Sequence, residues 1–414
     1  MSNNKQVSTD SGAGGGPSSS AATAVKYEPQ VLQRLIDQAA YFNVLSLSGS
    51  KCETAAINGQ GSDCIGFRVD EDLHRLAVTV QPPTAAEGLK ASNAVGESFG
   101  KFKHRWLFVP DDFTGAPDRE PPPTRLDPSR SQRFVMLDSV CTFGDGNDGF
   151  RGFGAGITFP VASDTGTQLL AATVGTILEG FGSFKGHQEG TYLHCGTLSA
   201  ERGFTGNLLL RVMDSQNTLR TTGGLAPLRG QTFPEPDVTY IVFRGQAVES
   251  DPVTPRLGPG GQLKGLNVVQ GLRLINLMSG LDDGPRSIAR VGQVIGKITA
   301  HVDFNPQAPG GTALNPIPFT TLDEIDFVDN SGQSIGGFTA NSSEGRVFTI
   351  RIAGQAGIRF GGVGSVLNGT GPFQGMTGLM TDNSVVIFQP HVSASLYVLR
   401  LNDPGGKFRS NVSC

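Results

Sequence analysis

A motif that occurs twice constrains the fold of this chain more than any other feature of its sequence. Residues 180–186 and 369–375 both read G-x-G-x-F-x-G and begin 189 positions apart. Three further residues keep that separation: Leu210, Arg211 and Asp214 correspond to Leu399, Arg400 and Asp403. A match that holds its register over this distance predicts an internal repeat.

Blocks upstream of the motif extend the repeat in the same order. Residues 137–155 match 322–340 at a separation of 185, and residues 95–110 match 291–306 at a separation of 196. The chain therefore contains one unit twice, at about 95–214 and 291–403, and each copy is long enough to bury a core of its own. Residues 44–94 and 215–290 also carry strand-like runs, but no collinear match relates them.

Composition agrees with a fold built from short strands and tight turns. The 414 residues include 57 Gly and 25 Pro, and only 17% are charged, which disfavours long solvated helices. A net charge of −4 and a pI near 5.9, without a run of Lys or Arg, argue against nucleic-acid binding. Residues 1–25 are rich in Ser, Gly and Ala without the apolar stretch of a signal peptide, and no run of about 18 apolar residues occurs. We therefore expect a cytoplasmic protein with a disordered tail and no membrane span.

The hydrophobic pattern predicts one helix followed by many strands. Apolar residues at helical spacing over 28–43, with Pro29 in the first turn, indicate an amphipathic helix. Short apolar or alternating runs bounded by turn residues indicate strands in both copies: 133–137, 169–174 and 208–213, then 346–352, 385–388 and 395–401. An antiparallel sheet with this many strands either closes on itself or leaves edges exposed, so closed barrels are expected.

These patterns together predict an all-β protein made of two tandem antiparallel barrels. Residues 1–25 form the tail, residues 26–225 the N-terminal barrel domain with its leading helix, and residues 226–414 the C-terminal barrel domain.

The order of motifs in the second copy carries a resemblance to a known family. Asp303-Phe304-Asn305 is followed by Asp329-Asn330-Ser331-Gly332, by Gly336-Gly337-Phe338, and then by the 369–375 motif with Gly378. This order resembles the allene oxide cyclase and dirigent barrels, which are small eight-stranded calycin-type barrels. The likeness covers most of residues 291–403 and, more loosely, 95–214. It implies a substrate held in an apolar lumen and cyclised or coupled without a cofactor, by folding it into a near-attack geometry.

The resemblance also implies site residues in the second copy. In allene oxide cyclases a Glu-apolar-Asn stretch on the first strand supplies a carboxylate and a water-holding amide, and Asp303-Phe304-Asn305 stands at that place. The chain departs from the family in having Asp for Glu and in lacking the Arg-Gly-Ser-Pro that follows. The first copy has Leu107-Phe108-Val109 there, so only the second would be active. Period two places Asp303 and Asn305 on one face, where they could point into the lumen or lie in solvent beside a turn.

Three groups of residues complete the predicted site. Tyr397, which stands where the first copy has Leu208, is a candidate donor in the lumen or a tyrosine at its rim. Phe338 and Phe373 are candidate substrate contacts, and Phe373, between the motif glycines, could close the barrel end. Arg400 is a further candidate contact, although its recurrence as Arg211 favours a structural ion pair. The same recurrence favours a salt bridge or turn cap for Asp138 and Asp323.

Other chemistries fit the sequence less well. The glycine motif is followed by another strand and not by a helix, which disfavours a dinucleotide site. His187, Glu189, Tyr192, His194 and Cys195 lie close together and suggest metal or nucleophile chemistry, but no second cluster has a familiar ligand spacing. Alternating strand residues explain them better, so neither a metal nor a cofactor is expected. Cys52 and Cys64 could pair in an oxidising compartment, although two free thiols are favoured.

The sequence thus leads to a cofactor-independent cyclase or isomerase of specialised metabolism, acting on a hydrophobic small molecule in the C-terminal lumen. Two alternatives remain open: a non-catalytic carrier of a hydrophobic ligand, and a structural protein with filled barrels. No nucleic acid or membrane partner is expected, and self-association into a homo-oligomer is left open.

Overall fold

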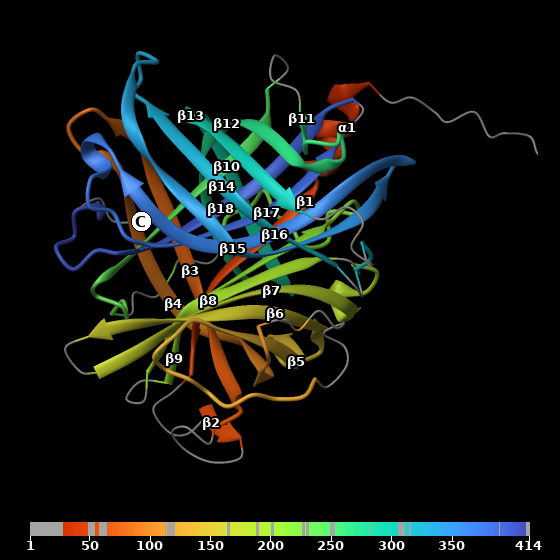
Figure 1. The fold of residues 1–414 in the computed structure, drawn as a ribbon, viewed down its shortest axis with the longest axis vertical. Coiled ribbons are helices and arrows are strands. Elements are labelled where there is room, and N and C mark those ends of the chain that lie inside the picture. The colour runs from red at the N-terminus through yellow and green to blue at the C-terminus, as the bar shows by residue number, and fades with distance from the viewer. Residues whose placement is uncertain are drawn as a thin grey trace, which may run out of the picture.

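The computed structural model of the chain consists almost entirely of antiparallel β-strands (Figure 1). It describes residues 28–48, 54–57, 64–111, 113, 121–163, 166–187, 190–199, 203–225, 228, 232–248, 253–282, 284–304, 311–313, 316–388 and 390–410. Within these ranges one helix and 18 strands are present, which confirms the predicted all-β class. No helix in this part of the chain is long and apolar enough to cross a membrane.

The elements repeat in the same order in the two halves. The first half contains α1 (Pro29–Ile36), β1 (Ala39–Leu47), β2 (Thr54–Ile57), β3 (Gly66–Thr84), β4 (Gly88–Phe108), β5 (Gln132–Phe143), β6 (Asp148–Ser163), β7 (Gly166–Phe181), the 3₁₀ turn η2 (Gly182–Phe184), β8 (Thr191–Ser199) and β9 (Gly203–Met213). The second half contains β10 (Val238–Ala247), β11 (Thr254–Leu257), β12 (Leu263–Leu281), β13 (Pro285–Phe304), β14 (Ile317–Val328), β15 (Ser334–Ile352), β16 (Gln355–Gly369), the 3₁₀ turn η3 (Gly371–Phe373), β17 (Gly378–Ile387) and β18 (Val392–Asn402).

The structure extends the repeat further upstream than the sequence match did. Strands β3 and β12 are both 19 residues long and begin 197 positions apart, and β1 and β2 correspond to β10 and β11. Residues 44–94 therefore do have a counterpart, within residues 238–290. The apolar run at 265–278, whose type the sequence left open, lies within β12.

The predicted helix is shorter than expected. It ends at Ile36, and the apolar residues that follow form β1, which pairs with β9 on one side and with β3 on the other. The helix predicted beyond residue 36 is therefore wrong. Hydrogen bonding of β1 to strands on both its edges outweighs the helical spacing of its apolar residues, and the aromatic side chains of Tyr41 and Phe42 also suit a strand. Leu32 and Ile36 are fully buried and pack against side chains of β15, β17 and β18.

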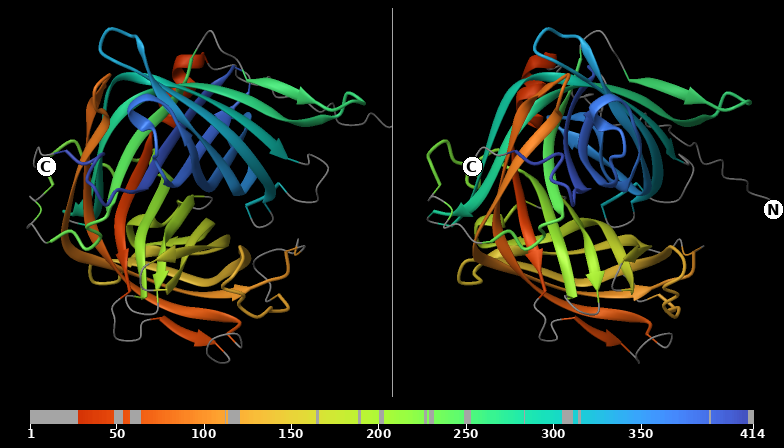
Figure 2. Two further views of the ribbon diagram at one scale, coloured as in Figure 1. Left: turned by 60° about the vertical axis from the view of Figure 1, so that its left-hand side comes forward. Right: turned by 90° about the vertical axis from the view of Figure 1, so that its left-hand side faces the viewer.

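Strand pairing closes twice. Strand β1 bonds to β9 and β3, and the pairs from β3 through to β9 complete a cycle that we call the N-terminal ring. Strand β10 bonds to β18 and β12 and completes the C-terminal ring with β13 to β17. Figures 1 and 2 show the N-terminal ring below and the C-terminal ring above it.

The two rings are joined to each other. Strands β3 and β12 pair at Val78 and Leu277, so all the strands belong to one antiparallel sheet. One apolar cluster also continues from the C-terminal ring across the contact to Tyr41, Leu193 and Leu209 of the N-terminal half. Two separate barrels are therefore not confirmed. The predicted domain boundary at 225–226 lies in the connection between β9 and β10.

The repeated glycine motif forms the same turn in both rings. A Cβ on Gly180 or Gly369 would lie 1.8 or 1.9 Å from the carbonyl oxygen of the motif phenylalanine, so no side chain fits. The second glycine has φ of +59° or +57°, which other residues rarely adopt. This turn points Phe184 and Phe373 into the rings, where they stack on Phe143 and Phe327 with centroid distances of 5.3 and 4.9 Å. The motif therefore builds an aromatic plug at one end of each ring.

Equivalent arginines join the two halves. Arg211 on β9 donates to the carbonyl oxygens of Asn383 and Ala394 at 3.3 and 3.0 Å. Arg400 on β18 donates to Thr197 Oγ1 on β8 at 3.0 Å and forms an ion pair with Glu235, and both charged side chains are almost completely buried. The recurrence of this arginine thus has a structural explanation: each copy reaches into the opposite half.

We predict that Arg400→Met destabilises the protein by about 3–5 kcal/mol, because Glu235 would stay buried without its partner. Chemical denaturation measures the change. Arg151→Met is the control, because Arg151 is largely exposed and its ion pair with Glu179 is long, at 3.9 Å, so its loss should cost little stability. Adding Glu235→Gln to Arg400→Met should recover part of the loss. Equal stability of Arg400→Met and Arg151→Met would contradict a structural role for Arg400.

Candidate functional site: a pocket between the two rings

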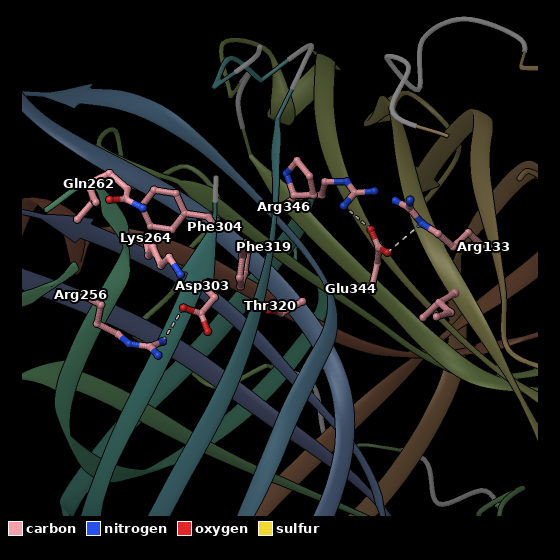
Figure 3. Close-up of a pocket in the computed structure, with 13 residues that line it drawn as sticks. Arg133, Arg256, Gln262, Lys264, Asp303, Phe304, Phe319, Thr320, Glu344 and Arg346 are labelled. Atoms are coloured by element: carbon pink, nitrogen blue, oxygen red, sulfur yellow. Dashed lines mark hydrogen bonds and ion pairs between the residues drawn. The ribbon is translucent and has the colours of Figure 1, made fainter. Parts of the chain in front are cut away.

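A pocket of about 1110 Å³ opens between the two rings (Figure 3). Strands β5 and β6 of the N-terminal ring form one wall, and β11 to β15 form the other. Its lining residues are Arg133, Ile157, Arg256, Gln262, Leu263, Lys264, Asp303, Phe304, Pro318, Phe319, Thr320, Glu344 and Arg346. A pocket of this size is large enough for a small organic ligand.

Two sets of ion pairs lie on different sides of the pocket. On one side Arg256 Nη1 donates to Asp303 Oδ1 at 2.7 Å. On the other, Glu344 contacts Arg346, its neighbour on β15, and lies with Oε2 3.5 Å from Nε of Arg133 on β5. Figure 3 shows Phe319 and Thr320 between these two sets. The Arg133–Glu344 pair also connects the rings, because its members belong to opposite halves.

The charge of the pocket is unbalanced. Four of its lining side chains are cationic and two are carboxylates, which leaves a formal excess of two positive charges. Five apolar residues also line the pocket: Ile157 on one wall, and Leu263, Phe304, Pro318 and Phe319 on the other. A ligand with an apolar body and an anionic group fits this combination best, because the body displaces water from the apolar wall and the anion offsets the charge.

Asp303 lies in this pocket and not in the interior of a ring. Its neighbours Ala300 and Val302 point inward and are buried, so period two turns Asp303 outward, where its side chain is 53% exposed. Of the two orientations that the sequence left open for Asp303, the structure shows the outward one, because the inward positions at this end of β13 are taken by small apolar residues. Asn305 lies outside the described residues.

The other predicted site residues are buried away from the pocket. Tyr397 lies inside the C-terminal ring and donates from its hydroxyl to Gln270 Oε1 at 2.8 Å, so it is not a rim tyrosine. Phe338 packs with Phe373 in the aromatic plug of the same ring. Arg400 is held in the contact between the rings. The structure thus brings Phe338 and Phe373 together but separates Asp303 from Tyr397.

Around Tyr397 the structure assembles an acidic cluster that the sequence prediction missed. Asp323 and Asp382 are both buried, and they accept hydrogen bonds from Thr321 Oγ1 at 3.0 Å and from the Ser384 hydroxyl. Burial raises the pKa of Asp323 to about 7. Burial also raises the pKa of Asp382 well above its usual range, and the nearby charge of Asp323 adds to that shift. These two carboxyl groups can therefore hold protons at a pH where exposed carboxyls are ionised.

Two sequence signals could have located this cluster. On β14 the inward positions alternate as Phe319, Thr321, Asp323, Ile325 and Phe327, so the apolar neighbours of Asp323 at period two mark it as buried. On β17 Asp382 lies in a polar run of four residues inside an otherwise apolar strand. The sequence match between Asp138 and Asp323 concealed the first signal, because it suggested the same role for both residues. In the structure their roles differ: Asp138 has φ of +53° and forms an exposed ion pair with Arg105.

His187 and His194 separate in the structure. His187 Nδ1 contacts the carbonyl oxygen of Met213 at 2.5 Å, whereas His194 points into the N-terminal ring. Glu189 lies outside the described residues. Among the residues described, the one group of three or more His, Cys, Asp or Glu side chains placed to hold a metal ion is Glu71, His104 and His194.

No family model, curated protein or solved structure matches this chain. The resemblance to the allene oxide cyclase and dirigent barrels therefore rests on the motif residues alone.

We predict that Asp323→Asn changes the pH dependence of stability. The folded-state pKa of Asp323, about 7, exceeds the value of about 3.9 expected in the unfolded chain, so between these values the folded state binds more protons. The free energy of unfolding of the wild type therefore falls as pH rises from about 4 to 7, by at most about 1.4 kcal/mol per pH unit from this group. The variant lacks this decline, so its stability relative to wild type should rise across that window and level off above it.

Denaturation at several pH values measures this difference. Asp326→Asn is the control, because Asp326 lies on the same strand but is exposed. A difference between Asp323→Asn and wild type that does not vary with pH would contradict a buried, protonated Asp323.

Proposed function

We propose that this protein binds a small molecule that has an apolar body and an anionic group, such as a carboxylate, in the pocket between the rings. The excess of cationic side chains beside five apolar lining residues carries the proposal. The ligand class therefore differs from the purely hydrophobic molecule expected from the sequence, in that it carries a negative charge.

The lining residues favour binding over chemistry. The thirteen residues include no His and no Cys, and the Asp303 carboxylate is engaged by Arg256 and half exposed. The Glu344 carboxylate is buried but is held by Arg133 and Arg346. A nucleophile with an adjacent base, or a desolvated carboxyl group without a cationic partner, would be expected in a site that performs acid–base or covalent catalysis. This supports the carrier alternative over turnover in the pocket.

Removing the charge of Arg256 and removing that of Asp303 should change the affinity for an anionic ligand in opposite directions, which allows a test. Anilinonaphthalene sulfonate is an anionic apolar dye whose fluorescence reports binding, and neutral N-phenylnaphthylamine is its uncharged counterpart. Arg256→Gln should weaken binding of the sulfonate by about three- to tenfold, because a cation is lost from a partly exposed site. Asp303→Asn should tighten it, because Arg256 then faces the ligand alone. Neither substitution should change the affinity for the neutral dye by more than about twofold, because this dye carries no charge that could interact with Arg256 or Asp303.

Arg151→Gln provides the matched control, since Arg151 lies on β6 outside the pocket. Circular dichroism must show that each variant keeps its fold, because loosely packed states also bind the dye. Equal sulfonate affinities for Arg256→Gln, Asp303→Asn and wild type would exclude the pocket as an anion site.

The interior of the C-terminal ring favours a second candidate, the cofactor-independent isomerase or cyclase. The observation that supports it is the pair of buried carboxyls beside Tyr397, with the pKa of Asp323 raised to about 7. At neutral pH Asp323 would serve as a base, while protonated Asp382 would donate to developing negative charge. The Tyr397 hydroxyl would also donate to it, on exchanging Gln270 for the substrate. The closed cycle of eight strands around this cluster supports a barrel of the allene oxide cyclase and dirigent type.

An isomerase converts a molecule into another of equal mass, so untargeted chromatography with mass detection can test this candidate. Metabolites from a cell extract should show a protein-dependent change between isobaric species, and Asp323→Asn should slow it by about 10²-fold or more, as loss of a general base does. Asp326→Asn should leave the rate unchanged. The absence of any isobaric change with the folded wild type would count against the isomerase.

A further inference from the structure

A set of buried ionisable side chains lies inside the N-terminal ring, apart from both sites above. Glu71 on β3, His104 on β4 and His194 on β8 all have fully buried side chains, and Ser46 on β1 is buried beside them. His194 reaches the others across the interior, because β8 is separated from β3 by β9 and β1. The residues are far apart in sequence, so ring closure alone brings them together.

Both histidines present the same nitrogen to one carboxylate. His104 Nε2 lies 3.3 Å from Glu71 Oε1, and His194 Nε2 lies 3.0 Å from Glu71 Oε2. Ser46 Oγ contacts Glu71 Oε2 and lies 3.3 Å from His194 Nε2. The three ligand atoms lie within 4.8 Å of one another.

This geometry does not suit a nucleophilic triad. In such a triad the hydroxyl and the acid bind opposite nitrogens of the imidazole, so that the acid orients the ring while the second nitrogen takes the proton. Here Ser46 and Glu71 both contact Nε2 of His194, and the Nδ1 atoms of both histidines have no hydrogen-bond partner. Two Nε2 atoms and a carboxylate within 4.8 Å of one another are instead an arrangement that can hold a metal ion.

The separations match those between ligands of a single ion. Zn²⁺ binds His nitrogen and carboxylate oxygen at about 2.0–2.2 Å, which places tetrahedral neighbours about 3.3–3.5 Å apart and octahedral neighbours about 2.9 Å apart. The measured 3.0 and 3.3 Å fall in this range. Ser46 Oγ is near enough to share the coordination shell or to hold a water in it.

Aromatic rings fix both imidazoles. Phe102 lies 4.7 Å from the His104 ring and Trp106 stacks on it at 5.6 Å, while Phe204 lies 4.4 Å from the His194 ring, centroid to centroid. These contacts exclude water and hold the ligands before an ion binds. Imidazoles bind a metal ion in their neutral form, so the carboxylate would give the ligand set a net negative charge, which a divalent cation would offset.

The C-terminal ring does not repeat this set. Counted from strand pairing, Gln270 occupies the position of Glu71 and Ala300 that of His104. Asp382 occupies the position of His194, because it pairs with Tyr397 as His194 pairs with Leu208. The histidines are therefore not needed to build the ring. We propose that Glu71, His104 and His194 bind one divalent transition-metal ion, with Zn²⁺ as the best fit to two imidazoles and one carboxylate. This differs from the sequence-based expectation of no metal.

Elemental analysis of the full chain after refolding with ZnCl₂ or with EDTA tests the proposal, because refolding allows the ion to reach a site that is closed in the native state. We expect one zinc per chain after refolding with zinc and dialysis, and a higher Tm than in the EDTA sample. Refolding with MgCl₂ should give no such gain. A folded wild type that retains less than about a tenth of an equivalent, without a Tm gain from zinc, would refute the site.

Variants locate the ion. His104→Gln and His194→Gln should each lower the zinc content to near zero, whereas His301→Gln should retain it, since His301 is a partly exposed histidine on β13 that contacts Asn267. If the two variants fail to fold, the visible spectrum of Co²⁺ bound to the wild type replaces them, because nitrogen and oxygen ligands in tetrahedral geometry give intense absorption. Full zinc content in folded His104→Gln or His194→Gln, or a Co²⁺ spectrum equal to that of the aqueous ion, would overturn the proposal.

Discussion

Closure of the strand pairing is the constraint on which the rest of this structure depends. Strands β1 and β10 are bonded on both edges, so neither ring leaves an open edge among its eight members. Closure satisfies the backbone hydrogen bonds of the main strands without a helical layer, and it turns every second side chain into a confined interior. Any polar group on that inward face has to find its partner there, since no water layer covers it.

The two rings meet this requirement in different ways. The N-terminal ring is filled largely by aromatic side chains, and its ionisable groups Glu71, His104 and His194 gather in one place. The C-terminal ring places Asp323, Asp382, Tyr397 and several hydroxyl groups in one hydrogen-bonded network. Because the scaffold is the same in both, these polar sets are features that each copy carries separately. They are therefore the places where function is expected, and the repeated glycine turns are not.

The contact between the rings is as much a part of the molecule as either interior. Outward side chains of β8, β9, β17 and β18 are buried in it, and Arg211 and Arg400 bond across it in opposite directions. At its edge the strands diverge, and the pocket with Asp303 and Glu344 opens between them. The β3–β12 pairing and one continuous apolar cluster hold the two rings together at this contact, beside which the pocket lies.

The sequence by itself determined the repeat, the all-β class and the turn around Phe184 and Phe373, because these depend on local patterns and on glycines that no other residue replaces. It also placed Asp303 and Tyr397 on strands of the second copy. Only the tertiary structure decided which way each of them points, since a strand's inward face is set by pairing register, and a bulge such as the one beside Asp138 shifts it by one residue. The cluster of Glu71, His104 and His194 has no sequence spacing to reveal it, because three distant strands meet only when the ring closes. The fold class could therefore be read from periodicity, whereas the sites depended on contacts between residues far apart in the chain.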